Sequence, residues 1–190
     1  MTFSFPAIAG ISEEQLAIHV ALYEGYVKHV NLIRSKIKEL TDADPEGNAY
    51  VVSELRRRFA FEFDGVRMHE LFFAQLTSGP SEVSEGALFA LATEKYGSWD
   101  GFITHIETVA LSRGIGWAVV AFDPVQKTLH SVFVGDHEVG QLAGLPILFV
   151  LDMWEHAFMV DYRPATKKEY VNAVLKATDW SVVETRLSNT

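Results

Sequence analysis

The chain contains no cysteine among its 190 residues. Disulfide bridges, thiolate metal sites, iron–sulfur clusters and cysteine nucleophiles are therefore excluded, so any metal must be bound by histidine and carboxylate. Basic residues are also scarce, because 16 Lys and Arg stand against 25 Asp and Glu and the net charge is -9. Proteins that bind phosphate backbones usually carry an excess of Lys and Arg, so nucleic acid is not an expected partner.

Long apolar runs are missing as well. The run PILFVLDMW, residues 146–154, is too short to cross a bilayer. The opening MTFSFPAIAGISEEQ lacks the basic segment and apolar stretch of a secretory leader. We therefore expect a cytoplasmic protein without a membrane partner. What the chain does have is 48% apolar residues, enough to bury the core of one compact domain or two small ones.

The first half of the chain carries the apolar spacing of two long helices. Apolar residues recur at three- and four-residue steps from Ser12 to Ile37, which predicts one long helix with Ser12 as its N-cap. The segment TDADPEGNA, residues 41–49, stops this helix. Helical spacing resumes from Tyr50 to Leu76, before TSGPS stops it again. These patterns predict a helical hairpin.

The second half has a mixed pattern. Two shorter helical segments, Ser81 to Tyr96 and Ser98 to Ser112, come first, and helical spacing returns over Lys167 to Lys176 and Trp180 to Leu187. Between them lie three segments rich in Val, Phe, Ile and Leu and bounded by turn residues, which predict strands: GIGWAVVAFD, TLHSVFVGD and LPILFVLD. A helical N-terminal half, residues 1–80, is therefore expected to join a mixed C-terminal half, residues 81–190.

The string DMWEHAFMVDY has the most specific spacing of chemical groups. Asp152 and His156 stand four residues apart, where a buried strand leaves the sheet. If this exit is helical, both side chains lie on one face. A carboxylate and an imidazole can then converge on iron, manganese or zinc. Taken alone, the same spacing also fits a capping Asp and a hydrogen-bonded His of the core.

The order Asp-x-Trp-Glu-His-Ala-aromatic resembles the C-terminal signature of the iron/manganese superoxide dismutases. This resemblance implies two further histidine ligands upstream. The stretch ISEEQLAIHVALYEGYVKHVN resembles the family's opening helix and offers His19, and FEFDGVRMHELFFAQL resembles its next long helix and offers His69. With Asp152 and His156 they complete the implied ligand set for one iron, which we favour, or one manganese per chain.

The resemblance also implies two residues that act beside the metal. Tyr26 matches the family's gateway tyrosine, although it follows His19 by seven residues where the family usually has eight. Seven residues are two turns of regular α-helix, whereas eight would need a π-bulge to keep both side chains on one face. We therefore interpret the shorter spacing as the loss of a π-bulge, with His19 and Tyr26 still on the same face.

The second implied residue is His137, the hydrogen-bond partner of the metal-bound solvent. The family reaches this solvent from the second long helix or from the turn after the second strand, and the helix position here is Gly65, which has no side chain. The turn FVGDHEVG resembles the variant of some iron-using and dual-metal members, which is why we favour iron. The alternative for His137 is an exposed loop residue. His29, His105 and His130 are expected to be surface or structural, without a convergent partner.

The implied fold is α+β, with an N-terminal long helical hairpin and a C-terminal domain whose three-stranded antiparallel sheet is flanked by helices. The implied activity is superoxide dismutation at a metal that cycles between M(III) and M(II). A homodimer with Glu155 at its interface is expected, although Met159 replaces the family's interface tyrosine and Leu22 or Tyr23 replaces its histidine partner.

Two alternatives to this activity remain open at the level of sequence. Two His and one carboxylate also suit other mononuclear non-haem iron enzymes. The second alternative is an inactive or non-enzymatic metal-binding homologue of the same fold.

Overall fold

The computed structural model describes residues 2–81, 83 and 85–190. In this part of the chain it has six α-helices, three strands and two 3₁₀ helices: α1 (Glu13–Ala43), α2 (Ala49–Ala74), α3 (Ala87–Tyr96), α4 (Trp99–Ala110), β1 (Gly116–Asp123), β2 (Thr128–Gly135), β3 (Ile147–Asp152), η1 (Glu155–Ala157), η2 (Pro164–Thr166), α5 (Lys167–Lys176) and α6 (Trp180–Ser188). The expected α+β fold is confirmed. None of the helices described is long and apolar enough to cross a membrane.

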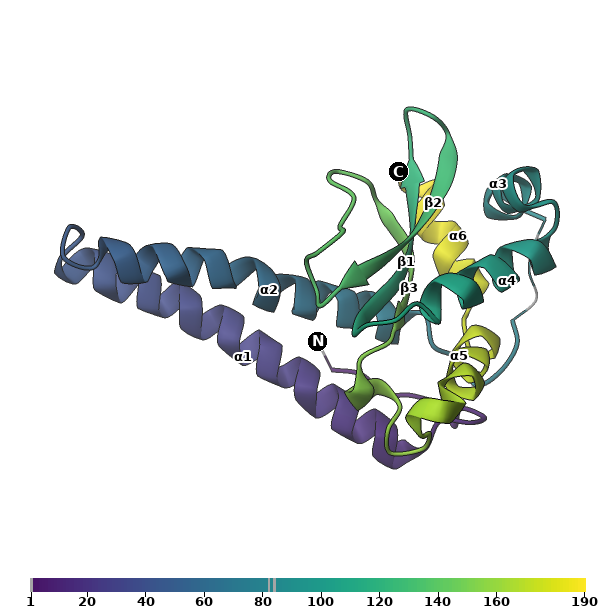
Figure 1. Ribbon diagram of the computed structural model, residues 1–190, viewed down its shortest axis with the longest axis horizontal. Helices are drawn as coiled ribbons and strands as arrows, with labels where there is room; N and C mark the ends of the chain where they lie inside the picture. The colour runs from purple at the N-terminus through teal and green to yellow at the C-terminus, as the bar shows by residue number, and fades with distance from the viewer. Residues whose placement is uncertain (1, 82, 84) are drawn as a thin grey trace.

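Helices α1 and α2 form the predicted hairpin, and both are long (Figure 1). Ser12 caps α1, because its side chain accepts a hydrogen bond from the Gln15 amide at 3.0 Å. The helix continues past Ile37 to Ala43 and ends where Asp44 adopts an extended backbone. Asp44 precedes Pro45, and the residue before a proline is sterically disfavoured in the helical region.

The predicted helix from Ser81 starts later than expected, at Ala87. A distant side chain fixes this start, since the Glu184 carboxylate accepts hydrogen bonds from the Ala87 and Leu88 amides, each at 2.9 Å. Ser81 has another role: its hydroxyl donates to Thr178 O and accepts from the Trp180 amide, both at 3.0 Å. Residues 82 and 84 of the predicted helix lie outside the described residues.

The three predicted strands form one antiparallel sheet in the order β2-β1-β3. The central strand β1 is buried at its first six residues, which explains its continuous apolar sequence. In the register, Trp117 of β1 pairs with Val134 of β2 and with Asp152 of β3. The sheet therefore brings the end of β3 next to Trp117.

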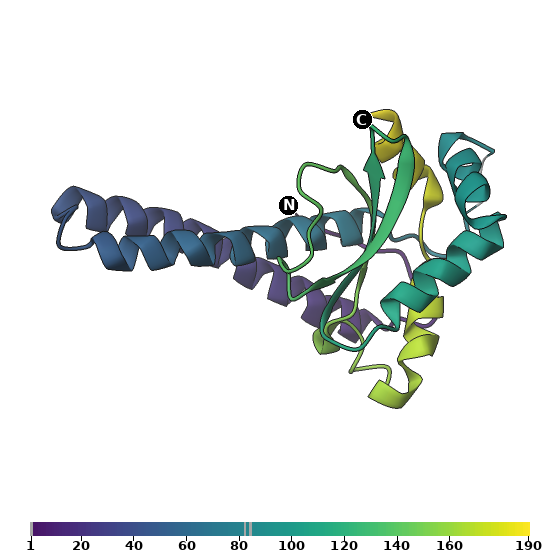
Figure 2. The ribbon, with the colours of Figure 1, turned by 45° about the horizontal axis from the view of Figure 1, so that its top comes forward.

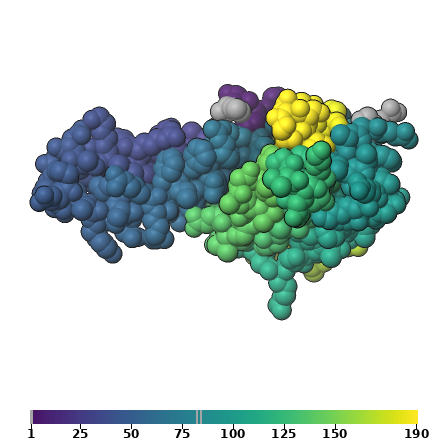
Figure 3. Space-filling model, turned by 90° about the horizontal axis from the view of Figure 1, so that it is seen from above, coloured from purple at the N-terminus to yellow at the C-terminus, as the bar shows by residue number. Residues whose placement is uncertain are grey.

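Among the described residues, the hairpin contacts the sheet and its helices at one end. Helices α3 to α6 gather on the side of the sheet away from the hairpin tip, and the C-terminal end of α2 contacts β3 (Figures 1 and 2). The outer half of the hairpin projects as an arm, which the space-filling view shows clearly (Figure 3). His19 and His69 lie in the half of the hairpin that contacts the sheet, so this junction is where the candidate site forms.

Candidate metal centre

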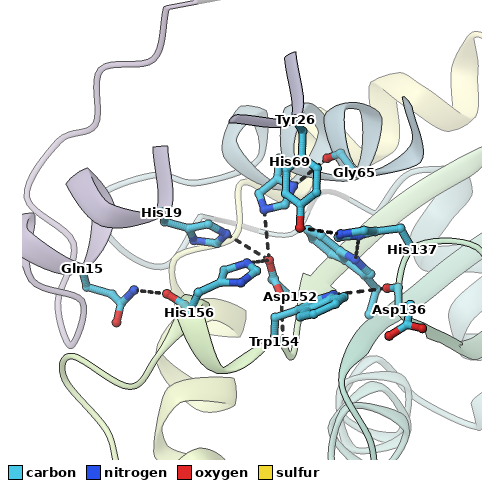
Figure 4. Close-up of polar contacts among 11 residues, drawn as sticks. Gln15, His19, Tyr26, Gly65, His69, Asp136, His137, Asp152, Trp154 and His156 are labelled. Atoms are coloured by element: carbon cyan, nitrogen blue, oxygen red, sulfur yellow. Dashed lines mark hydrogen bonds and ion pairs between the residues drawn. The ribbon is translucent and has the colours of Figure 1, made fainter. Parts of the chain in front are cut away.

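The four side chains predicted as metal ligands come together where the hairpin meets the sheet (Figure 4). Each offers one ligand atom, and these atoms all lie within 4.8 Å of one another. The Asp152 Oδ2 atom lies 3.0 Å from His19 Nε2, 3.4 Å from His156 Nε2 and 3.5 Å from His69 Nε2. We call this group the His/Asp cluster: His19, His69, Asp152 and His156.

The exit from β3 is not the helix that the spacing of Asp152 and His156 favoured. The Met153 amide donates to Gly116 O at 2.8 Å, so the chain stays extended beyond the strand. His156 then lies in the 3₁₀ helix η1, after an extended Trp154. The Trp154 amide donates to Asp152 Oδ1 at 2.8 Å, which leaves Oδ2 facing the imidazoles. The two side chains converge through this turn and not through an α-helical face.

A residue that the sequence analysis did not single out holds His156 in place. Gln15 is buried, with 1% of its surface exposed. Its side-chain Nε2 donates to His156 O at 2.6 Å, and its Oε1 accepts from the Val160 amide at 3.0 Å. Gln15 lies four residues before His19 on α1, hence on the same face. That spacing is the one signal in the sequence that could have identified it.

The ring nitrogens of the cluster are arranged to bind a cation. His69 Nδ1 donates to Gly65 O at 2.6 Å, because a carbonyl only accepts, so the proton of a neutral ring is on Nδ1 and Nε2 carries a lone pair. Among the described residues, His69 Nε2 and His156 Nε2 are buried without a hydrogen-bond partner. Leaving such atoms unpaired costs about 1–3 kcal/mol each. A bound metal ion would accept the lone pairs of both nitrogens, so the residues of the cluster fit a metal site.

Electrostatics favours the protonation states that metal binding requires. Burial lowers the pKa of His19, and it lowers the pKa of His69 to about 3. Burial alone would raise the pKa of Asp152, but His156 and His19 together hold it far below its usual range. His19 and His69 are therefore offered as neutral imidazoles and Asp152 as an ionised carboxylate, the forms in which these side chains bind metals. Three nitrogen ligands and one oxygen ligand suit iron and manganese.

His137 lies in the turn after β2 and is fully buried, so it is not an exposed loop residue. The Trp117 indole donates to His137 Nδ1 at 2.9 Å, and an indole N–H cannot accept. A neutral His137 therefore carries its proton on Nε2 and donates it to the Tyr26 hydroxyl oxygen, 2.9 Å away. Burial lowers the pKa of His137 to about 4 and raises that of Tyr26 to about 12, so both are neutral at pH 7.

Tyr26 and His19 lie on one side of an uninterrupted α1, as the seven-residue spacing predicts. The Tyr26 ring is 5.3 Å from the ring of His69. Gly65 makes this approach possible, since a Cβ there would lie 2.8 Å from a carbon of the Tyr26 ring. The sequence showed only that Gly65 lacks a side chain. The structure gives a steric reason, because a side chain here would collide with Tyr26.

Aromatic rings surround the cluster. Trp154 stacks on His137 at 4.9 Å and on His156 at 5.7 Å between ring centroids. The ring of Phe73 is 4.9 Å from that of His19. Phe61, which the sequence analysis did not identify, lies 4.7 Å from the His137 ring. These rings surround the site with apolar surface and lower the local dielectric, which strengthens the electrostatic interactions within it.

The three remaining histidines lie outside the cluster. His105 packs on the ring of Tyr96, with 4.7 Å between centroids. In the described part of the chain, neither of the other two joins a group of metal-binding atoms, although each lies near one carboxylate. His29 Nδ1 is 3.4 Å from the buried Glu62, and His130 Nε2 is 3.6 Å from Asp123.

Comparison with known proteins adds independent evidence. Residues 84–186 match the family model described as iron/manganese superoxide dismutases, C-terminal domain. The chain is 33% identical to the superoxide dismutase [Fe] of Aquifex pyrophilus over 94% of this chain and 85% of that protein. It is 30% identical to the superoxide dismutase [Mn] of Haloarcula marismortui over 90% and 82% of the two chains. These matches span both halves of the molecule. The chain belongs to the iron/manganese superoxide dismutase family.

Proposed function

We propose that the chain dismutes superoxide at one iron or manganese ion held by the His/Asp cluster. The observation that carries this proposal is the convergence of four ligand atoms around Asp152 Oδ2, two of them buried nitrogens without a hydrogen bond among the described residues. The metal, when bound, supplies the M(III)/M(II) couple that oxidises one superoxide to dioxygen and reduces a second to hydrogen peroxide. The reaction consumes two protons, so the surrounding residues must position proton donors.

Tyr26 and His137 are proposed as the catalytic residues beside the metal. His137 donates its Nε2 proton to the Tyr26 oxygen, which orients the hydroxyl. The Tyr26 proton then points away from His137 and is available to a partner on the side of the cluster. Because the pKa of Tyr26 is raised to about 12, this hydroxyl remains protonated at neutral pH. We propose that Tyr26 lies where superoxide enters.

Neither alternative from the sequence is favoured. Other mononuclear non-haem iron enzymes use two His and one carboxylate, whereas this cluster contains three His and one carboxylate. A metal-binding protein without activity would not need the ordered donors from Trp117 through His137 to Tyr26.

The proposal also includes a choice between iron and manganese. Relatives of the chain are named for iron and for manganese. We propose iron, on the resemblance of the His137 turn to that of iron-using members. The expected result is equal or higher activity of the iron-only form when iron-only and manganese-only proteins are compared at equal occupancy. A tenfold advantage for manganese, roughly 1.4 kcal/mol in barrier height, would overturn this choice.

A homodimer is proposed, with Glu155 at the interface. Glu155 is exposed in the single chain. Exposed apolar side chains on α1 and just after η1, two elements that contact each other, support the proposal. They are Ile18, Leu22, Met159 and Val160, each between 38% and 48% exposed. Clustered exposed apolar residues are typical of interaction sites.

The expected result by light scattering is twice the mass of one chain. Met159→Glu should shift the protein toward the monomer, because a charge would be buried in the contact. Val125→Glu, at a residue exposed to 89% in the turn between β1 and β2, serves as the control and should remain dimeric. A monomeric wild-type protein at micromolar concentration contradicts the proposal.

A further inference from the structure

Arg186, in the last helix, makes an unusual set of contacts for a cation. Its guanidinium donates to Leu71 O at 2.7 Å, to Leu148 O at 2.7 Å and to Gln75 Oε1 at 3.1 Å. All three acceptors are neutral, and in the described part of the chain no carboxylate lies within 4 Å of it. Burial lowers the pKa of Arg186 to about 10. Arg186 is partly buried, and burying a cation without a counter-charge costs solvation free energy. The three hydrogen bonds offset this cost.

The acceptors lie in or beside two of the four elements that carry cluster residues, α2 with His69 and β3 with Asp152. Leu71 follows His69 by two residues at the end of α2. In a regular α-helix the Gln75 amide would donate to Leu71 O. Here it donates instead to Phe72 O at 3.3 Å, so the Leu71 carbonyl lacks its usual helical partner. Carbonyls in the last turn of a helix need such an outside donor, and a cation there also interacts favourably with the helix dipole. Leu148 lies in β3, four residues before Asp152.

Gln75 joins the same two elements directly. It is the C-cap of α2 and is fully buried. Its Nε2 donates to Val150 O at 2.5 Å, and its Oε1 lies 3.4 Å from the Val150 amide. Because β3 is an edge strand, its outer backbone groups have no neighbouring strand, and the Gln75 amide takes that place. Val150 lies two residues before Asp152.

From these contacts we infer that Gln75 and Arg186 are positioning residues of the metal centre, which set the separation between His69 on α2 and Asp152 on β3. The inference rests on the proposed ligand set. His69 and Asp152 come from opposite halves of the chain, so no local structure fixes their separation. Metal sites require their ligands to be held within about 0.5 Å of the productive geometry. Groups that hydrogen-bond metal ligands directly typically change metal affinity by 10–100-fold. Gln75 and Arg186 act one step further out, on backbone atoms two to four residues from His69 and Asp152.

The test is the rate at which metal-loaded protein releases its metal to an excess of chelator. Arg186→Met keeps an unbranched apolar stem and removes all the donors, and Gln75→Leu removes the amide at similar volume. Both variants are expected to release metal at least tenfold faster than the wild type. Arg186→Lys keeps the charge with fewer donors and should lie between. This variant also secures the test if Arg186→Met does not fold.

A matched control separates positioning from general destabilisation. Val183→Ala removes fully buried apolar contacts on the same helix and touches none of these hydrogen bonds. Its metal release is expected to stay within twofold of the wild type, even where its apo form unfolds as easily as that of Gln75→Leu. If release follows apo stability in all variants, Arg186 and Gln75 are structural only and the inference fails. A wild-type protein that holds no metal would instead contradict the proposed ligand set.

Discussion

Replacing His69 with alanine is expected to abolish both metal retention and superoxide removal. His69 is fully buried, and its Nε2 lies 3.5 Å from the carboxylate oxygen at the centre of the cluster. The variant loses one of four proposed ligands at a point that no other described side chain can fill. Removing a group that merely hydrogen-bonds a ligand already lowers metal affinity by 10–100-fold. We therefore expect removal of the ligand itself to lower metal affinity by more than about a hundredfold.

Two measurements check this expectation. Elemental analysis after loading with iron and with manganese gives the metal content, and the decay of superoxide gives the activity. Circular dichroism checks that the variant is folded, because removing this buried ring leaves a cavity among aromatic side chains. His105→Ala is the matched control, since that ring packs on Tyr96 away from the cluster, and it should keep both metal and activity. A His69→Ala protein that retains one metal per chain excludes His69 as a ligand.

Replacing His137 with alanine is expected to separate catalysis from metal binding. His137 contacts Trp117 and Tyr26 by hydrogen bonds, whereas the four proposed ligands remain in place. The variant should therefore keep its fold and its metal. Turnover should fall by about a hundredfold, the lower range for a positioned proton-transfer group. The reduction potential and the pH profile of turnover should also shift, because hydrogen bonds near a metal tune both.

A conservative variant makes this prediction specific. The side-chain amide of His137→Gln can still donate to the Tyr26 oxygen, so it should recover part of the lost turnover, while Tyr26→Phe should lose turnover with the metal retained. The prediction fails if His137→Ala keeps the activity and the potential of the wild type, as His105→Ala should.

The sequence predicted those features that depend on local patterns or on the family resemblance. Apolar spacing gave the hairpin, and β-branched and aromatic residues gave the three strands. The four side chains expected to bind metal do converge, and His137 is buried beside Tyr26. The roles of these residues as ligands and catalysts stay predictions.

Features set by distant contacts could not be predicted. The start of α3 depends on Glu184, almost a hundred positions along the chain, whose carboxylate caps it. The exit from β3 depends on the Met153 amide bonding to Gly116 O in another strand. Gln15 resembles any polar residue of a first helical turn until its contact with His156 is known. In each case tertiary contacts override the local preference.

The division into residues 1–80 and 81–190 also stays a prediction. Hydrogen bonds cross this boundary at several points: the Thr77 amide donates to Ala177 O and the Asp179 amide to Gln75 O, both at 2.7 Å. Arg186 of the second half caps a helix of the first. Because the two parts share these bonds, we expect them to unfold together in a single transition.

The most direct test of the account is the product stoichiometry of the protein loaded with one metal per chain. Superoxide is supplied in large excess over protein, and dioxygen and hydrogen peroxide are measured together with the metal content. We expect close to one metal ion per chain and many turnovers per chain, with one dioxygen and one hydrogen peroxide formed for every two superoxide consumed. Fully loaded protein that removes superoxide no faster than the free metal ion, or only once per chain, would contradict it.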